Sequence, residues 1–365
     1  MPEKLRVGVI GATGMVGQRF ISLLAQHPWF EVVTLAASER SAGKCYREAV
    51  GDRWRMMSPM PEHAAELVVK DASLVHEVSS GLDLVFCAVD MPKDQTQALE
   101  ESYAKAEVPV ISNNSANRLA PDVPMILPEI NPDHFAAIDA QKKRLGTKRG
   151  FIVVKPNCSI QSYVPALHPL REFGIQKAFV CTYQAISGAS KTFKDWPEME
   201  DNVMPFIRGE EEKSEIEPLK IWGAVRGGVI VNAKDPVITS QCIRVPVTDG
   251  HLAAVFVSFK HKPSMEQMRQ RWESFEGRPQ TLNLPSAPKP FLTYFEDENR
   301  PQTRLDRDAG GGMAISVGRL REDRILDYRF VCLSHNTIRG AAGGGILSAE
   351  LLRAEGYIGR APAGT

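Results

Sequence analysis

Residues 6–17, RVGVIGATGMVG, determine the fold expected for the first half of this chain. A β-branched run ends at a glycine-rich turn, and residues 15–26 then carry apolar side chains at helical spacing. Glycine in such a turn lets the backbone approach a pyrophosphate, which the free N–H groups of the helix N-terminus can bind. The pattern predicts a dinucleotide site; the alternative is a turn that only packs. The residues expected to form the site are Gly11, Thr13, Gly14, Met15, Val16 and Gly17.

Further strands and helices follow this unit in alternation. Residues 32–36, 84–89 and 110–112 are short apolar runs typical of buried strands, and residues 95–105 are expected to form a helix. Alternating strands and helices with continuously apolar strands predict a parallel sheet covered on both faces. We therefore expect an α/β fold whose first domain, residues 1–156, is a Rossmann dinucleotide-binding domain.

The second half shows longer strand-like runs. Residues 141–150, QKKRLGTKRG, are polar and basic and are interpreted as a solvated connection. Strands are expected at 178–186, 239–247 and 252–260, the last two joined by a hairpin turn at 248–250. This predicts an α+β catalytic and dimerisation domain with a mixed sheet at 157–334. In the third segment, 335–365, a helix at 337–354 is expected to pack back on the first domain.

Composition limits the classes of protein that the chain can belong to. It has 365 residues, 43% of them hydrophobic, and its 44 basic residues balance 44 acidic ones. No overall field favours a nucleic-acid or membrane partner, and no apolar run is long enough to cross a bilayer. The six cysteines are far apart without a CxxC pair, so neither a disulfide framework nor a zinc site is expected. These features predict a folded, cytoplasmic protein without a metal site.

The segment SERSAG at 38–43 bears on the choice of dinucleotide. NAD-specific sites carry an acidic residue at the end of the second strand, near position 37, which here is alanine. Ser38, Arg40 and Ser41 offer hydroxyls and a guanidinium suited to a 2′-phosphate. NADP is therefore the predicted cofactor, provided that Glu39 points to solvent.

A candidate nucleophile lies in KPNCS at 155–159, between a strand-like run and a helix expected from about residue 160 to 172. A thiol at a helix N-terminus is easier to ionise because of the helix dipole. Cys158 is therefore predicted to be a nucleophile, and a buried inert cysteine is the alternative.

Several motifs, in order over nearly the whole chain, resemble the aspartate-semialdehyde dehydrogenases, and some details resemble the archaeal and fungal branch. One departure is Ser190, where the family frequently has glycine. The motifs are GATGMVG (11–17), SERSAG (38–43), NNSANR (113–118), PNCS (156–159), YQAISGAS (183–190), EEEK (210–213) with Glu217 and Lys220, Arg244 with DGH (249–251), and HNTIRGAAGG (335–344).

The resemblance implies an NADPH-dependent, reversible conversion of 4-phospho-L-aspartate to L-aspartate 4-semialdehyde through a cysteine thioester. It also implies a role in the pathway to threonine, methionine, isoleucine and, in some organisms, lysine, and a homodimer or homotetramer. The implied substrate ligands are Arg244 for the α-carboxylate, Glu210 for the ammonium, Arg118 and Lys213 for the phosphate, and Asn157. His251 is the implied proton shuttle and Gln184 orients the acyl group. Asn157, Ser187, Gly188 and Asn336 are expected on the cofactor side.

Three competing interpretations accompany these assignments. Residues 210–220 could be a solvated helix with charge pairs. N-acetyl-γ-glutamyl-phosphate reductase shares the chemistry, but its substrate has no charged nitrogen for Glu210. A non-catalytic dinucleotide sensor would need neither Cys158 nor His251.

The expected hairpin also places two site residues together. In it Arg244 pairs with Val255 and shares a face with His251, so Arg244 and His251 would line one pocket.

Overall fold

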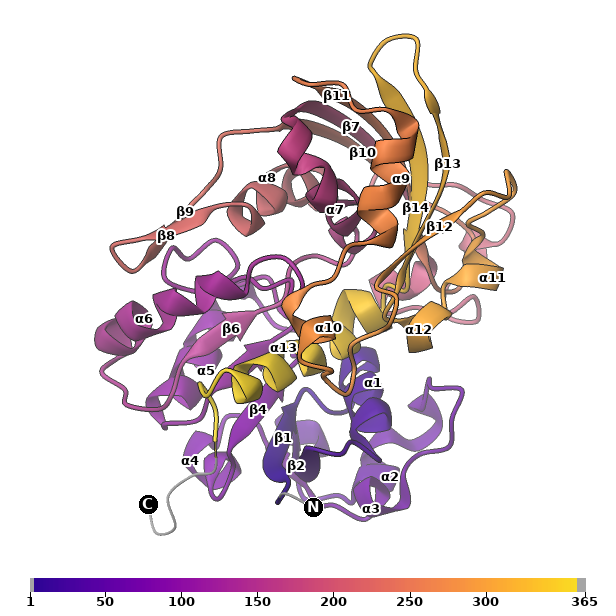
Figure 1. Ribbon diagram of the computed structural model, residues 1–365. Coiled ribbons are helices and arrows are strands. Elements are labelled where there is room, and N and C mark those ends of the chain that lie inside the picture. The colour runs from indigo at the N-terminus through magenta and orange to yellow at the C-terminus, as the bar shows by residue number, and fades with distance from the viewer. Residues whose placement is uncertain (1–2, 360–365) are drawn as a thin grey trace.

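The computed structural model describes residues 3–359 and has two sheets (Figure 1). The first sheet has six strands in the order β3-β2-β1-β4-β5-β6, all paired in parallel. This is the strand order of a Rossmann domain, so the predicted α/β fold is confirmed. Its strands are β1 (Leu5–Ile10), β2 (Phe30–Ala37), β3 (Val69–Asp71), β4 (Leu84–Cys87), β5 (Val110–Ser112) and β6 (Ile152–Val154).

Helices pack around this sheet, including one from the end of the chain. Helix α13 contacts α1 and β5, and Gly345 lies so close to Phe20 that an added Cβ would be 3.0 Å from its ring. A one-turn π-helical segment, Ile338–Ala342, leads into α13. The helices are α1 (Met15–Leu24), α2 (Tyr46–Val50), α3 (Glu62–Ala65), α4 (Val75–Ser79), α5 (Lys93–Lys105), α6 (Ile138–Leu145) and α13 (Gly343–Ala354).

The interpretation of residues 141–150 as a solvated connection was wrong for its first half, which forms the end of α6. Gln141 is fully buried there. Its amide donates to the carbonyl oxygens of Asp122 and Ile152, and its Oε1 accepts from the Ile152 N–H. A single glutamine thus satisfies both backbone polar groups of Ile152, the first residue of β6.

The second sheet is mixed, as predicted, in the order β10-β7-β11-β14-β13-β12. Strand β10 pairs with β7 and β12 with β13 in parallel, and the other pairs are antiparallel. Helices α7 and α9 cover the face turned toward the viewer in Figure 1. Its strands are β7 (Ile175–Gln184), β10 (Val237–Arg244), β11 (His251–Phe259), β12 (Leu292–Phe295), β13 (Ile315–Glu322) and β14 (Tyr328–Ser334).

The predicted hairpin between the second and third runs was wrong, because β7 lies between β10 and β11. The connecting residues 245–250 cross the end of β7 instead. There the N–H of Val245 donates to the Gln184 carbonyl and the N–H of Ile186 donates to the Val247 carbonyl. The turn at 248–250 therefore belongs to a connection that passes β7, and it does not join neighbouring strands.

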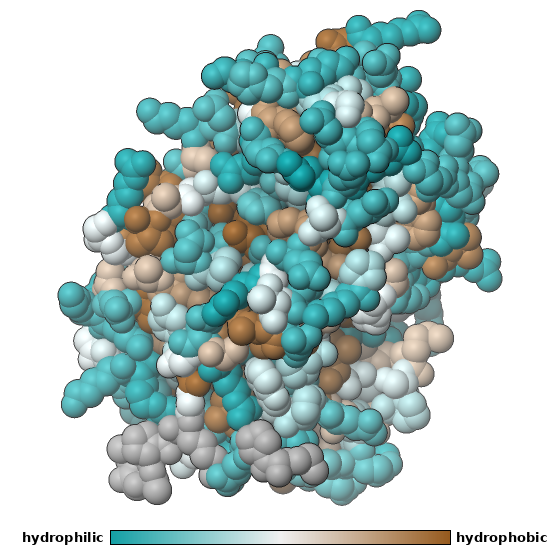
Figure 2. Space-filling model, in the orientation of Figure 1, coloured by the Kyte–Doolittle hydropathy of each residue, from teal (hydrophilic) through white to brown (hydrophobic). Residues whose placement is uncertain are grey.

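The remaining elements complete the second half. The surface in Figure 2 is mostly hydrophilic, with apolar side chains in scattered patches, and none of the described helices is long and apolar enough to cross a membrane. The elements are α7 (Ile160–Leu167), α8 (Glu210–Ile221), β8 (Ala224–Arg226), β9 (Val229–Val231), α9 (Met265–Glu273), α10 (Arg278–Thr281), α11 (Thr303–Asp306) and α12 (Ala309–Gly312).

Candidate active site

Cys158 lies between β6 and α7, two residues before the helix begins. Its Sγ is 3.4 Å from Nε2 of His251, the first residue of β11. Gly340 covers the other side, since an added Cβ there would lie 2.9 Å from the Cβ of Cys158. Three segments far apart in the chain thus meet at the thiol.

The orientation of the His251 ring follows from its backbone contact. Nδ1 accepts a hydrogen bond of 3.0 Å from the N–H of Ala185. Burial, aided by the charge of Arg244, lowers the pKa of His251 to about 3, so the ring is neutral near pH 7. A neutral ring that accepts at Nδ1 carries its proton on Nε2, and that proton faces Cys158. His251 is therefore a hydrogen-bond donor toward the thiol.

The expectation that Cys158 ionises easily was wrong, because the protein groups around it raise the pKa of its thiol. Burial raises the pKa of its thiol, and the nearby Glu210 carboxylate raises it further. Lys155, Arg118 and Arg244 act in the opposite direction. Because desolvation disfavours the thiolate, its effect outweighs that of the three cations.

Arg244 is connected to His251 through Ala185, the residue that follows β7. Its Nη1 donates to the Ala185 carbonyl at 2.7 Å, so Arg244 and His251 hold opposite sides of one residue. Gly188 packs against both, since an added Cβ would lie 2.9 Å from Arg244 Nη1 and 3.1 Å from His251 Nε2. Arg244 and His251 therefore lie near each other as expected, although β7 separates their strands in the sheet.

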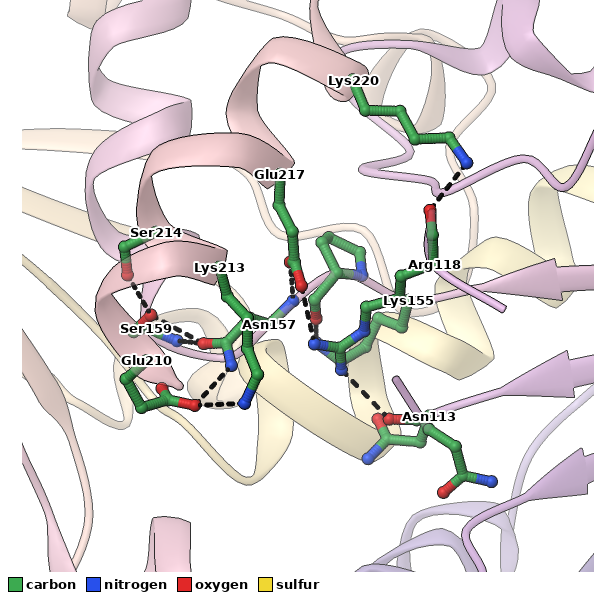
Figure 3. Close-up of polar contacts among 12 residues, drawn as sticks. Asn113, Arg118, Lys155, Asn157, Ser159, Glu210, Lys213, Ser214, Glu217 and Lys220 are labelled. Atoms are coloured by element: carbon green, nitrogen blue, oxygen red, sulfur yellow. Dashed lines mark hydrogen bonds and ion pairs between the residues drawn. The ribbon is translucent and has the colours of Figure 1, made fainter. Parts of the chain in front are cut away.

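Helix α8 supplies the next group of side chains (Figure 3). Glu210 Oε1 accepts from Asn157 Nδ2 at 3.0 Å and from Lys213 Nζ at 2.8 Å. The Asn157 Oδ1 accepts from the N–H and hydroxyl of Ser159. Both polar ends of the Asn157 side chain are therefore occupied by protein groups.

Arg118 has donor capacity to spare. It is 7% exposed, and its Nη1 donates to Glu217 at 2.9 Å while its Nη2 makes a longer 3.3 Å bond to the Asn113 carbonyl. Its Nε is buried with no hydrogen-bond partner among residues 3–359. A buried unpaired donor is costly, and an oxyanion would satisfy it.

The other expected residues lie on nearby segments and bond to protein groups. Gln184 is buried and donates to the Thr182 hydroxyl at 3.2 Å. Asn336 donates to the Ser187 hydroxyl at 2.8 Å and accepts from the Gly250 N–H at 2.8 Å. Asn336 thereby ties the loop after β7 to the turn before β11.

A separate cavity of about 480 Å³ lies at the carboxyl ends of β1 and β2 and is lined by the expected Gly11, Thr13, Gly14, Ser38 and Arg40. Glu39 is exposed and does not line it. Gly17 serves packing, since an added Cβ would lie 2.2 Å from the Gly11 carbonyl oxygen. Met15 and Val16 start α1. Ser41 is buried beneath this loop, where its N–H donates to the Ser38 carbonyl. This cavity has the chemistry for a dinucleotide with a 2′-phosphate.

The structure adds buried charged residues that the sequence analysis did not assign to the site. Lys155, Glu217 and Lys220 are each 2% exposed, and burial lowers the pKa of Lys155 to about 7 and that of Lys220 to about 8. Residues 210, 213, 217 and 220 share one face of a helix. That spacing was the available signal against a solvated helix.

Comparisons with known proteins agree with this geometry. A family model described as "Semialdehyde dehydrogenase, NAD binding domain" matches residues 6–138, and one described as "Semialdehyde dehydrogenase, dimerisation domain" matches residues 167–339. The chain is 44% identical to the aspartate-semialdehyde dehydrogenase of Archaeoglobus fulgidus, over 96% of this chain and 99% of that one. It is 42% identical to that of Aspergillus fumigatus, over 97% and 99%.

Solved structures give the same result. The crystal structure of aspartate semialdehyde dehydrogenase with NADP from Candida albicans superposes with a TM-score of 0.86 at 40% identity, covering 98% of this chain and all of that one. A Vibrio cholerae enzyme described as aspartate semialdehyde dehydrogenase II complexed with ASA superposes at 0.73 with 25% identity, over 97% and 99%. The archaeal and fungal relatives bear out the expected branch.

Proposed function

The chain belongs to the aspartate-semialdehyde dehydrogenase family, and we propose that the side chains around Cys158 carry out that family's reaction as follows. The protein is an NADP-dependent, phosphorylating aldehyde dehydrogenase. It interconverts 4-phospho-L-aspartate and L-aspartate 4-semialdehyde, with consumption of NADPH and a proton and release of phosphate. The assignment of residues rests on the 3.4 Å contact of Cys158 Sγ with His251 Nε2, near the charges of Arg118 and Arg244.

Cys158 is the nucleophile. Its thiolate attacks the acyl carbon, the bond from that carbon to the phosphate oxygen breaks, and the leaving phosphate takes up a proton. Bound NADPH supplies hydride to the thioester carbon. The Nε2–H of His251 donates a hydrogen bond to the oxyanion that develops there. The C–S bond then breaks, which releases the aldehyde and regenerates the thiolate.

Two charged residues near Cys158 would bind the two ends of the amino-acid part of the substrate. Arg244 comes from β10 and Glu210 from α8, and their charges shift the Cys158 pKa in opposite directions. A guanidinium fork suits the α-carboxylate and a carboxylate suits the ammonium. An ammonium beside Glu210 would offset the negative charge that raises the Cys158 pKa, whereas the carboxylate and the phosphate would offset the positive charges of Arg244 and Arg118 that lower it.

Arg118 and Lys213 hold the phosphate. The unpaired Nε of Arg118 supports this role, and Lys213 adds a cation at the first turn of α8. Gln184 orients the acyl group, and Asn157 holds Glu210 in place through its amide.

NADP is the cofactor, and the glycine turn with Ser38, Arg40 and Ser41 binds its pyrophosphate and 2′-phosphate. Helix α1 begins directly after Gly14 with no acidic residue in its first turn, which suits an anion at its N-terminus. Ser187, Gly188 and Asn336 would lie beside the nicotinamide. The cavity lined by Gly11, Thr13, Gly14, Ser38 and Arg40 supports the assignment of the phosphate-binding part.

The chain carries a dimerisation domain. The homodimer is proposed to form through the face of the second sheet that α7 and α9 do not cover. A tetramer would pair two such dimers. An apolar hollow of about 640 Å³ lies on that face. Phe179, Val237 and Ile325, with 39%, 63% and 91% exposure, lie around it. We also propose domains at 1–156, 157–334 and 335–365, a cytoplasmic location, and a role in supplying threonine, methionine, isoleucine and, in some organisms, lysine.

Phosphate-dependent reduction of NADP by the purified protein with aspartate semialdehyde tests the function. We expect turnover that requires both phosphate and the free α-ammonium group. Preference for N-acetylglutamate semialdehyde would favour the reductase alternative, and NADP binding without turnover would favour a sensor.

A further inference from the structure

Glu217 links two parts of the active site that come from different segments of the chain. Its Oε1 accepts from Arg118 Nη1 at 2.9 Å and its Oε2 accepts from the backbone N–H of Asn157 at 2.6 Å. The carboxylate is 2% exposed and lies on α8, which contributes neither of these partners (Figure 3). Each oxygen therefore holds one functional segment.

The peptide group between Pro156 and Asn157 is held from both ends. Its N–H donates to Glu217, and its carbonyl oxygen accepts from the Lys155 ammonium at 2.6 Å. Asn157, which supplies this N–H, immediately precedes Cys158. Hydrogen bonds to a carboxylate are stronger and shorter than neutral ones, so Glu217 fixes the N–H side of the peptide, and Lys155 Nζ binds its carbonyl side.

Helix α8 also holds the backbone of Arg118. One turn after Glu217, the Lys220 ammonium donates to the carbonyl oxygens of Arg118, Ala120 and Val123 at 2.6 to 2.9 Å. The guanidinium and the main chain of Arg118 are thus bound by adjacent residues of one helix face. With both held, the remaining freedom of Arg118 is small.

We propose that Glu217 is a positioning residue that fixes the phosphate-binding Arg118 relative to the Cys158 backbone. The inference rests on the proposed function, in which phosphate leaves the same carbon that Cys158 attacks. The leaving group and the nucleophile must then be held in one geometry, and small displacements of reacting groups reduce rates strongly. One carboxylate between the two segments supplies that geometry.

A purely structural ion pair is the competing explanation, because breaking a buried pair destabilises a protein whatever its function. The two explanations differ in which kinetic constants change. Arg244 and Glu210, which are proposed to hold the semialdehyde, make no hydrogen bond or ion pair with Glu217 among residues 3–359. A positioning role therefore predicts the largest effect on the KM for phosphate, a smaller effect on the KM for the semialdehyde through the Asn157–Glu210 bond, and none on the KM for NADP.

The test compares Glu217→Gln and Glu217→Asp with Glu215→Gln. The amide of glutamine must turn its NH₂ toward one of two donors, so at most one bond survives. Aspartate keeps the charge but is one methylene shorter. Glu215 is a matched control on α8, since its Oε1 accepts from the Ser240 N–H at 2.9 Å, away from Arg118 and Cys158.

Assays of NADP reduction, with each substrate varied in turn, give the readout. We expect Glu217→Gln to raise the KM for phosphate by roughly 10-fold or more and to slow alkylation of Cys158 by iodoacetamide. The KM for NADP should stay within about twofold, and the KM for the semialdehyde should rise less than that for phosphate. Glu217→Asp should recover part of the loss, and Glu215→Gln should behave as the unmodified protein.

A double variant separates coupling from general damage. If Glu217 acts through Arg118, Glu217→Gln should add little to the phosphate KM in an Arg118→Ala background. Full additivity, or equal changes in all three KM values, would overturn the proposal. Should Glu217→Gln not fold, the same comparison is made with Glu217→Asp. An unmodified protein without phosphate-dependent turnover would instead remove the proposed function itself.

Discussion

The cofactor cavity and the catalytic cluster are built in opposite ways. Five of the expected cofactor residues lie between Gly11 and Arg40, within one β-α-β unit, and line a single cavity. The catalytic side chains come from segments between Arg118 and His251, namely the loops that follow β5 and β6, three strands of the second sheet, and α8. The first site is made by backbone conformation, which short motifs encode. The second is made by long-range packing, which positions side chains against one another.

Glycine shows the difference most clearly. Gly11 has a φ of 83° and Gly17 makes room for its carbonyl, so both shape a backbone turn. Gly188 and Gly340 make room for side chains, those of Arg244, His251 and Cys158. Changes in the two regions should therefore affect different kinetic constants.

The largest expected effect is the loss of the nucleophile. Cys158→Ser should reduce turnover at least about 1000-fold because it removes only the attacking thiolate, while NADPH affinity measured by fluorescence titration stays unchanged. Cys45→Ser, at the start of α2, is the control and should keep full activity. Substantial turnover by Cys158→Ser would contradict the division into two sites.

The next largest effects are expected when a methyl group is added to one glycine in each site. Gly188→Ala should lower kcat about 100-fold, since it displaces Arg244 or His251 by some tenths of an ångström. Gly14→Ala meets nothing closer than 3.5 Å, so it should fold normally and raise mainly the KM for NADPH, where the pyrophosphate must come close. The comparison fails if both variants change the same constant.

The preference for NADPH over NADH should shrink by roughly 10-fold in Arg40→Ala/Ser41→Ala, because the 2′-phosphate loses charge-assisted hydrogen bonds. The ratio of kcat/KM for the two cofactors measures this. Glu39→Ala, which alters the exposed neighbour, should leave the ratio unchanged. An unmodified protein that uses both cofactors equally would refute the assignment.

The smallest expected effect is on the free energy of unfolding at acid pH. It concerns His168, which lies in the second half of the chain and outside the catalytic cluster. Burial lowers the pKa of His168 to about 4, below its unfolded value near 6.5. Between these values the unfolded chain binds more protons, so this contribution to stability is present above pH 6.5 and is lost as the pH falls toward 4.

His168→Gln should therefore reduce the drop in unfolding free energy between pH 7 and 4.5 by up to about 2 kcal/mol, with kcat at pH 8 unchanged. Urea unfolding at the two pH values provides the measurement. His76→Gln, at an exposed position, should show the same drop as the unmodified protein; an equal drop in His168→Gln would contradict the prediction.

Much of the fold could be predicted because its signals are local. Strands β1, β2, β4 and β5 and helices α1 and α5 appear within a few residues of their expected limits. The order of strands in the second sheet was beyond such reasoning. A turn of three residues at 248–250 satisfies hairpin rules, yet β7 contacts both flanking strands.

Ser190 illustrates the boundary between the two kinds of information. Its position in a motif marked it as a departure from a frequent glycine, and the structure gives it a φ of 56°. Left-handed backbone favours glycine, which explains the family's choice. That serine adopts this conformation here became known only from the fold.

The sequence by itself determined the dinucleotide turn, the parallel sheet, the chemical types of the catalytic side chains and, through its motifs, the family. Only the tertiary structure decided that Arg244 and His251 meet across Ala185, that the Cys158 pKa is raised, and that Glu217 joins Arg118 to the nucleophile. The physical reason is range. Turn conformation depends on neighbouring residues, whereas desolvation and charge pairing depend on every segment that packs around a group.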